Sequence, residues 1–507
     1  MKRSRVGIAA VVWTLGFGIW GLGSGFWGQA LPAAQDQAAD PILEYQRAGA
    51  FFDEGRYAEA LRAFDAATRS DDAALTDRAR KGKVRSALRI AEFTLAREEA
   101  EHFAGRANDG EASALLGDAL WSMGQFDEAD PEYARALAIN PESSRGRFGA
   151  ARSLAMRSRL DDALALTLTT IESAPRDPDL RALAGSILER LHRFDAAAVE
   201  YANYAALLPP GEATAIETAR ARADFLRSFS GRLPLDIEPR DAQVAHTLPF
   251  KLVRNKVVVQ GRLNGQGVEW VLDTGAERTG ISHELAYRGR IRSVATTYTA
   301  GVGRASLRQI RLGRADTLDV GGLRIRNVPV SIRNPASDGA PRWQGQTLSP
   351  LALGLSVIVD YQRRQVTLAR RLPNERGGFT LPLRMHRLPF VRGLLNDAHA
   401  AYFVVDTGGE VISISAETAS ALRMAPSRRL PLRVFGLSGL DESAFLLPGV
   451  DLDFEDIEYR KVGLAVLNLR APSVLLGFQV GGIVGHKFLG GYRVAFDLER
   501  GELRLSK

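Results

Sequence analysis

The C-terminal half of the chain repeats itself at a spacing of 133 residues, and this duplication constrains the fold more than any other feature. The word Asp-Thr-Gly occurs at residues 273–275 and again at 406–408, and Thr-Leu-Pro lies 26 residues before each aspartate. Either word alone could occur by chance, but two copies with a matched offset are not accidental. Short β-branched stretches between glycine turns surround both copies, which is typical of strands. The sequence therefore predicts two homologous all-β lobes, over residues 246–372 and 379–507.

Two carboxylates brought together would supply a specific chemistry. Carboxyl groups about 3 Å apart cannot both ionise, so they share one proton. The ionised group can then draw a proton from a water molecule while the protonated group polarises a carbonyl. This chemistry needs no cofactor, and the sequence predicts neither a cofactor nor a metal site. It has no cysteine, no His-Glu-x-x-His and no Gly-x4-Gly-Lys-Ser/Thr phosphate loop.

The duplicated words resemble the catalytic loops of pepsin-like and retropepsin-like aspartyl proteases, and most closely bacterial retropepsin-like domains duplicated in one chain. The resemblance covers residues 246–507 and implies two lobes related by a pseudo-twofold axis. It implies that Asp273 and Asp406 are the catalytic aspartates. The remaining loop residues would support them, the threonines by crossed hydrogen bonds between the loops and the glycines by leaving room for water: Thr274, Gly275, Thr407 and Gly408.

Further elements of this family have counterparts in the sequence. Residues 482–485, Gly-Ile-Val-Gly, resemble the apolar-apolar-Gly element that supports a catalytic loop, with Gly485 as its second glycine. In the first lobe the equivalent is Gln-Thr-Leu at 346–348, which lacks the second glycine. This departure predicts a weaker support for Asp273.

Two glycine-rich hairpins are candidate flaps that would close over a bound peptide, although plain glycine turns have the same pattern. One contains Gly301 and Gly303, and the other contains Gly436 and Gly439. The residue three after each aspartate is alanine or glycine, whereas pepsin-like enzymes tend to carry a hydroxyl there. The resemblance to retropepsins then predicts activity at mildly acidic to near-neutral pH.

A period of 34 residues fills the preceding part of the chain. The spacing recurs in Pro141, Pro175 and Pro209, and small residues recur with it at positions 117, 151 and 185. This pattern resembles the tetratricopeptide repeat, in which helical hairpins stack into an array. It predicts an all-α domain over residues 41–230 that ends in a capping helix. Such arrays bind peptides or partner proteins on a concave face, and a spacer that only orients the lobes is the equal alternative.

The first thirty residues have the pattern of a secretory signal. Basic residues precede a long uncharged stretch, and small residues follow at 28–30. We expect export to the periplasm or the medium, with a cleaved signal peptide over residues 1–30. The alternative is an uncleaved segment that anchors the chain in the inner membrane.

The charge composition excludes little but argues against nucleic acid as a partner. The formal net charge is +7, and the basic residues lie scattered among acids rather than in blocks. The sequence thus predicts a multidomain α and β protein that acts as an exported aspartic endopeptidase, with the helical array recruiting or positioning a protein substrate or partner. The alternative is a peptide-binding protein of the same fold with little or no catalysis, in which the array is the main interaction module.

Overall fold

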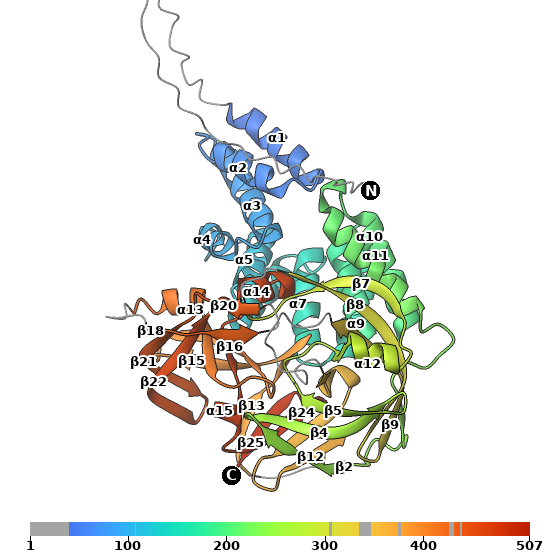
Figure 1. Ribbon diagram of the computed structural model, residues 1–507. Coiled ribbons are helices and arrows are strands. Elements are labelled where there is room, and N and C mark those ends of the chain that lie inside the picture. The colour runs from blue at the N-terminus through green and yellow to red at the C-terminus, as the bar shows by residue number, and fades with distance from the viewer. Residues whose placement is uncertain are drawn as a thin grey trace, which may run out of the picture. The chain divides into compact units, whose positions relative to one another are not determined.

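Helices occupy the first half of the chain and strands the second half in the computed structural model (Figure 1). The structure describes residues 40–106, 108–303, 307–333, 346–373, 377–424, 430–436 and 439–507. The expected signal peptide lies outside these ranges. The helices of the first half are α1 (Pro41–Asp53), α2 (Tyr57–Ala67), α3 (Ala73–Arg89), α4 (Phe93–Glu101), α5 (Gly110–Ser122), α6 (Phe126–Ile139), α7 (Ser144–Met156), α8 (Leu160–Ser173), α9 (Pro178–Arg190), α10 (Phe194–Leu207), η1 (Pro210–Glu212) and α11 (Ala213–Arg227).

The 34-residue period corresponds to pairs of antiparallel helices. Each repeated proline stands two residues after the end of a helix, at α6, α8 and α10, because proline cannot continue a helix. The small residues lie where the helices of a pair touch: a Cβ on Gly117 would stand 2.6 Å from the ring of Tyr133. The repeat therefore follows from close packing of α5 on α6 and of the equivalent pairs.

The segment that follows the last helical pair of the array contacts the first helical pair. The amide of Gly211, after the last repeat, donates to the carbonyl of Glu54 in the first helical pair at 3.0 Å. Between these ends, Arg89 of α3 forms a bidentate ion pair with Asp179 of α9, with both N···O distances 2.9 Å. Bidentate arginine–carboxylate pairs fix geometry as well as supply energy. This pair therefore holds the second helical pair, α3 and α4, against the fifth, α9 and α10.

Three sheets form most of the two lobes. The first lobe is built on the order β1-β9-β6-β10-β5-β4-β8-β7, with β3 paired to β4, and the second on β14-β15-β16-β23-β17-β22-β21-β18. A third sheet, β13-β25-β24-β11-β12-β2, takes strands from both. The strands of the first lobe are β1 (Asp236–Glu238), β2 (His246–Pro249), β3 (Lys251–Val253), β4 (Lys256–Leu263), β5 (Gln266–Leu272), β6 (Thr279–Ser282), β7 (Ser293–Thr299), β8 (Arg308–Val320), β9 (Leu323–Arg333), β10 (Thr347–Leu348), β11 (Ser356–Asp360) and β12 (Gln365–Ala369).

The second lobe repeats this plan. Its strands are β13 (Phe379–Pro382), β14 (Arg384–His386), β15 (Leu388–Leu395), β16 (His399–Val405), β17 (Ile412–Ser415), β18 (Leu430–Pro431), β19 (Val434–Gly436), β20 (Gly439–Asp441), β21 (Phe445–Phe454), β22 (Ile457–Leu467), β23 (Gly482–Val484), β24 (Arg493–Asp497) and β25 (Glu502–Ser506). Short helices complete the lobes: α12 (His283–Arg288), η3 (Leu351–Leu353), α13 (Ala416–Ala421), α14 (Arg470–Leu476) and α15 (His486–Leu489).

The shared sheet displays the pseudo-twofold symmetry that the duplication predicts. Its two central strands, β11 and β24, come from different lobes and pair antiparallel. Each lobe adds its own strand to the outside of this pair, and the two Thr-Leu-Pro words form the outermost strands, β2 and β13. A common sheet therefore joins the two lobes through main-chain hydrogen bonds.

The helical array shares a hydrophobic core with the second lobe. Phe126 at the start of α6 lies 4.6 Å from Trp121, 4.7 Å from Tyr402 of β16 and 4.9 Å from Phe478, measured between ring centroids. All four rings are buried. Aromatic clusters of this kind add specific contacts to a large buried area, so the array is built into the lobes rather than tethered beside them.

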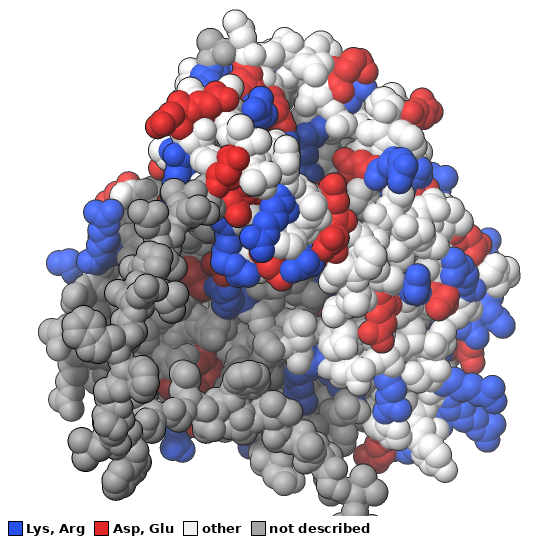
Figure 2. All heavy atoms as spheres, turned by 90° about the horizontal axis from the view of Figure 1, so that it is seen from above, with Lys and Arg blue, Asp and Glu red and all other residues white. Residues whose placement is uncertain are grey.

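The array also holds the hairpin β7–β8 of the first lobe. Phe225 of α11 and the nearby Phe229 belong to one buried cluster with Ile310 and Leu312 of β8. Within the described ranges, no helix combines the length and the apolar character that crossing a membrane requires. Figure 2 shows acidic and basic side chains interspersed on the face seen from above, which fits the scattered charges of the sequence.

Candidate active site

Asp273 and Asp406 each stand directly after a buried strand that runs parallel to a short supporting strand. Asp273 follows β5, and its amide donates to the carbonyl of Leu348 in β10 at 2.9 Å. Asp406 follows β16, and its amide donates to Val484 in β23 at 3.0 Å. The two aspartates thus have the same backbone environment in the two lobes.

Crossed hydrogen bonds between the two threonines join the loops. The Thr274 hydroxyl donates to the Val405 carbonyl at 2.6 Å and accepts from the Thr407 amide at 3.0 Å. The Thr407 hydroxyl donates to the Leu272 carbonyl at 2.8 Å and accepts from the Thr274 amide at 3.1 Å. Both side chains are almost fully buried. Every polar atom of this arrangement is paired, as a buried polar network requires.

The glycines allow the loops to approach until each touches the opposite aspartate. A Cβ on Gly275 would lie 2.5 Å from Cγ of Asp406, and a Cβ on Gly408 would lie 2.8 Å from Cγ of Asp273. The two carboxyl groups lie close enough that each shifts the pKa of the other. The structure therefore brings the two candidate catalytic residues together.

Burial and mutual proximity raise the pKa of both carboxyl groups. Burial, followed by the repulsion from Asp406, raises the pKa of Asp273 to about 7. Burial also raises the pKa of Asp406, but the Gly408 amide, which donates to it at 2.7 Å, works in the opposite direction. Hydrogen bonds from amides stabilise the charged form of a carboxylate. The pair can therefore share one proton, which resides mainly on Asp273 because its pKa is the higher of the two.

Two cations near the pair were not predicted from the sequence. Lys256, at the start of β4, donates to the Gly408 carbonyl at 2.6 Å, and its charge lowers the pKa of both aspartates. Arg333, at the end of β9, donates to Thr347 at 2.9 Å, and its charge lowers the pKa of Asp273. These cations offset part of the effect of burial. No spacing in the sequence relates either of them to the aspartates, so only the fold could identify them.

A serine takes part in the support of Asp273 at the position where the glycine is missing. By strand register, Ser349 occupies the place that Gly485 holds in the second lobe. A Cβ on Gly485 would lie 2.5 Å from the Gly409 carbonyl carbon, so that position is closed to other residues. Ser349 is accommodated in the first lobe, where its hydroxyl donates to the Ala276 carbonyl at 2.6 Å. A side-chain hydrogen bond thus ties this strand to the first catalytic loop.

The candidate flap glycines lie on two hairpins that contact each other. Gly301 and Gly303 lie between β7 and β8, and Gly436 and Gly439 face each other in the hairpin β19–β20. A Cβ on Gly436 would lie 2.2 Å from the carbonyl oxygen of Val302. Segments that a twofold axis relates can touch each other only near that axis. Both hairpins and both aspartate loops therefore lie on the pseudo-twofold axis.

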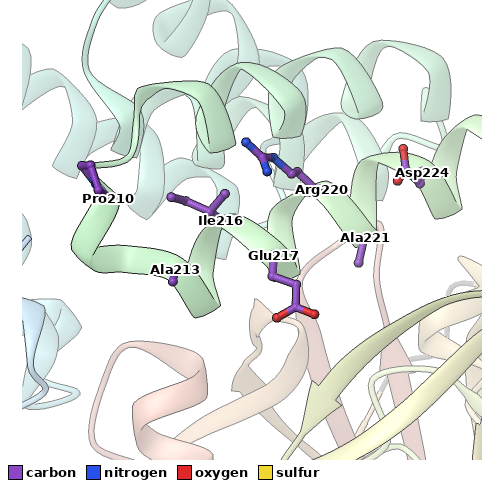
Figure 3. A pocket seen from close by; sticks show the side chains of 7 residues that line it. All are labelled: Pro210, Ala213, Ile216, Glu217, Arg220, Ala221 and Asp224. Atoms are coloured by element: carbon purple, nitrogen blue, oxygen red, sulfur yellow. The ribbon is translucent and has the colours of Figure 1, made fainter.

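A separate hollow lies along η1 and α11, and none of its lining residues comes from the lobes (Figure 3). It is lined by Pro210, Ala213, Ile216, Glu217, Arg220, Ala221 and Asp224. In the part of the chain that the structure describes, no group of three or more histidine or acidic side chains could hold a metal ion.

Comparison with known families finds one match in each half of the chain. Residues 259–357 match the model of an aspartyl protease family, and residues 120–187 match a tetratricopeptide repeat model. The helical half thus contains a tetratricopeptide-like segment and the β-rich half a segment similar to aspartyl proteases, and the fold class expected from the sequence is confirmed. A search of curated proteins finds no significant match.

Several solved tetratricopeptide repeat structures are similar to parts of the chain. YrrB, described as having an unusual peptide-binding site, is 23% identical over 35% of this chain and 90% of its own, with a TM-score of 0.22. The thermophilic protein TTC0263 of Thermus thermophilus is 17% identical over 37% of this chain and 98% of its own, with a TM-score of 0.31. A MamA structure is 21% identical over 29% and 88%, with a TM-score of 0.24.

Proposed function

We propose that this protein is an aspartic peptidase that hydrolyses peptide bonds with a water molecule activated between Asp273 and Asp406. The observation that carries the proposal is the close approach of the two aspartate loops, each of which touches the opposite carboxyl group, with the pKa of Asp273 raised to about 7. Such a pair holds one proton across the mildly acidic range, which is the state that acid–base hydrolysis requires.

The surroundings of the pair give the two carboxyl groups different roles. Asp406 accepts a hydrogen bond from the Gly408 amide and lies near Lys256, and both interactions stabilise its charged form. It is therefore the ionised member of the pair and takes a proton from the water. Asp273, with the higher pKa, keeps its proton and donates a hydrogen bond to the carbonyl of the scissile peptide. The crossed threonine bonds hold the two groups in this geometry, which saves the cost of orienting them during the reaction.

A catalytically inactive peptide-binding protein is the alternative, and it drew its support from the missing glycine in the first lobe. The hydrogen bond of Ser349 and the strand pairing of β10 remove that support. A pure binder also has no need of two complete Asp-Thr-Gly loops. We therefore favour the enzyme.

We also propose that the protein is exported and that the array positions a protein substrate or partner. The export proposal rests on the signal-like pattern of the first thirty residues. A reporter fused behind residues 1–40 would then be exported, and substitution of the leading basic residues by acidic ones would retain it in the cytoplasm.

The enzyme assay uses the full-length protein with a library of peptides derived from denatured proteins. We expect hydrolysis by the wild type and loss of at least about 10²-fold in rate for both Asp273→Asn and Asp406→Asn, because each group has its own role in proton transfer. Circular dichroism establishes that both variants are folded. Hydrolysis that survives both substitutions would exclude the proposed mechanism.

A further inference from the structure

The segments that follow the two catalytic loops differ in exposure although the lobes are homologous. Glu277 and Arg278, four and five residues after Asp273, have side chains that are 19% and 12% exposed. The equivalent residues after Asp406 are Glu410, whose side chain is 53% exposed, and Val411, which is 43% exposed. One side of the aspartate pair is thus covered and the other is open.

An ionic cluster between the array and both lobes covers the Glu277 side. Glu277 accepts from Arg387 of the second lobe at 2.6 Å. Arg278 lies 3.7 Å from Glu189 of α9, and Arg222 of α11 donates to the same glutamate at 2.8 Å. The neighbouring arginines lower the pKa of both glutamates, so the cluster is fully charged. Removal of one member would leave its buried partners uncompensated.

Three further contacts extend this cover, and we call the whole set of contacts the wall. Arg387 also donates to the Leu475 carbonyl of α14 at 3.0 Å. Arg190 of α9 donates to the Met385 carbonyl of the second lobe at 3.1 Å. The imidazole of His192, just after α9, lies 2.8 Å from the Cβ position of Gly354 in the first lobe. Helical array, first lobe and second lobe therefore meet on this side of the pair.

A substrate that crosses the aspartates must run past both segments. The contact between the hairpins at Val302 and Gly436 and the two aspartate loops lie on the pseudo-twofold axis, so we expect an extended peptide to run between them. The axis also places residues 276–278 on one side of the pair and residues 409–411 on the other. On one side the substrate would run past the exposed Glu410 and Val411, and on the opposite side it would meet the contacts that include Glu189 and Arg222.

We propose that this wall makes the enzyme a terminal peptidase, which cleaves bonds close to one end of a polypeptide and not bonds in its interior. This inference rests on the proposed function, because it concerns which bonds the same aspartates reach. The short arm of the substrate lies on the Glu277 side, and the long arm leaves past Glu410. The array thus selects a chain end through its position over the lobes, independently of any partner it binds.

The test compares linear peptides with head-to-tail cyclised peptides of the same sequence, using the full-length protein and mass spectrometry of the products. We expect cuts within a few residues of one terminus of the linear peptides. The cyclic forms have no chain end to place against the wall. They should therefore react at least about tenfold more slowly, because they cannot bind across the aspartates as the transition state requires. Comparable dyad-dependent cleavage of both forms would overturn the inference and leave the proposed function standing. Absence of any cleavage that depends on Asp273 and Asp406 would remove both.

A substitution in the wall provides a second, independent readout. Arg222→Met removes one charge of the cluster on the side of the array, and we expect it to increase cleavage of cyclic and internal sites relative to terminal sites. The matched control is Arg227→Met on the same helix, whose ion pair with Asp224 is exposed. It should leave the ratio of internal to terminal cleavage unchanged. An unchanged ratio in a folded Arg222→Met protein would contradict the inference.

Discussion

Replacing Thr407 by valine tests whether the crossed threonine bonds hold the two catalytic loops together. Valine has nearly the shape of threonine but lacks the hydroxyl, so the substitution removes two hydrogen bonds without opening a cavity. The Thr274 amide and the Leu272 carbonyl then lose their partners inside the protein. The hydrogen bond from Thr274 to Val405 remains.

The expected loss of stability follows from the burial of these groups. Thr274 is 1% exposed and Thr407 0% exposed, so water cannot replace the lost partner. Each buried polar group left unpaired costs about 1–3 kcal/mol, and two of them cost about 2–6 kcal/mol. This is a large part of the 5–15 kcal/mol that roughly describes the stability of a domain.

The assay is amide hydrogen exchange with mass spectrometry of segments 266–282 and 399–415 under increasing urea, which reports local opening free energies. Thr407→Ser keeps the hydroxyl and should recover most of the protection. Thr247→Val is the matched control, since its hydroxyl pairs with Thr367 in an exposed position, and it should change stability by less than about 0.5 kcal/mol. Protection in Thr407→Val equal to that of the wild type would refute the role given to the crossed threonine bonds.

Two further substitutions test the close approach and the charge of the pair. Gly275→Ala places a methyl group 2.5 Å from Cγ of Asp406 and should abolish hydrolysis. The control is Gly267→Ala on β5, where the methyl group meets nothing within 4 Å and activity should be retained. An active Gly275→Ala enzyme would contradict the close approach of the two loops. Lys256→Met removes a cation that lowers the pKa of both aspartates, so both limbs of the pH–rate profile should move to higher pH. The exposed Lys251 serves as the control, because Lys251→Met should leave the profile unchanged. A Lys256→Met profile that does not move, or that moves to lower pH, would contradict the effect of Lys256 on the pKa of the pair.

The sequence alone was sufficient to predict the features that repeat. The 34-residue period predicted the helical pairs because their contacts require small residues at fixed positions, and the family comparison confirms them. The doubled Asp-Thr-Gly word predicted two homologous lobes for a similar reason. Each lobe must place the same loop at the axis, so the same residues recur in both.

The features that do not repeat could not be predicted in this way. Ser349 takes the place of a glycine through a hydrogen bond that depends on the shape of one loop. Lys256 and Arg333 approach the aspartates only after strands distant in sequence have paired. The ionic wall joins residues of the array to residues of both lobes, and no periodic signal connects Glu189 with Arg278. The first three depend on how segments distant in sequence pair within the lobes, and the wall depends on where the array lies on the lobes.

The pH dependence of kcat/KM for a peptide substrate tests the central claim most directly, namely that Asp273 and Asp406 act as one pair that shares a proton. Ionisation of Asp406 should raise the rate from the acidic side, and loss of the proton from Asp273 should lower it near pH 7, where its pKa lies. We therefore predict a bell-shaped profile with its maximum at mildly acidic pH. A profile that peaks near about pH 2, or that still rises above about pH 8, would contradict the shared-proton pair.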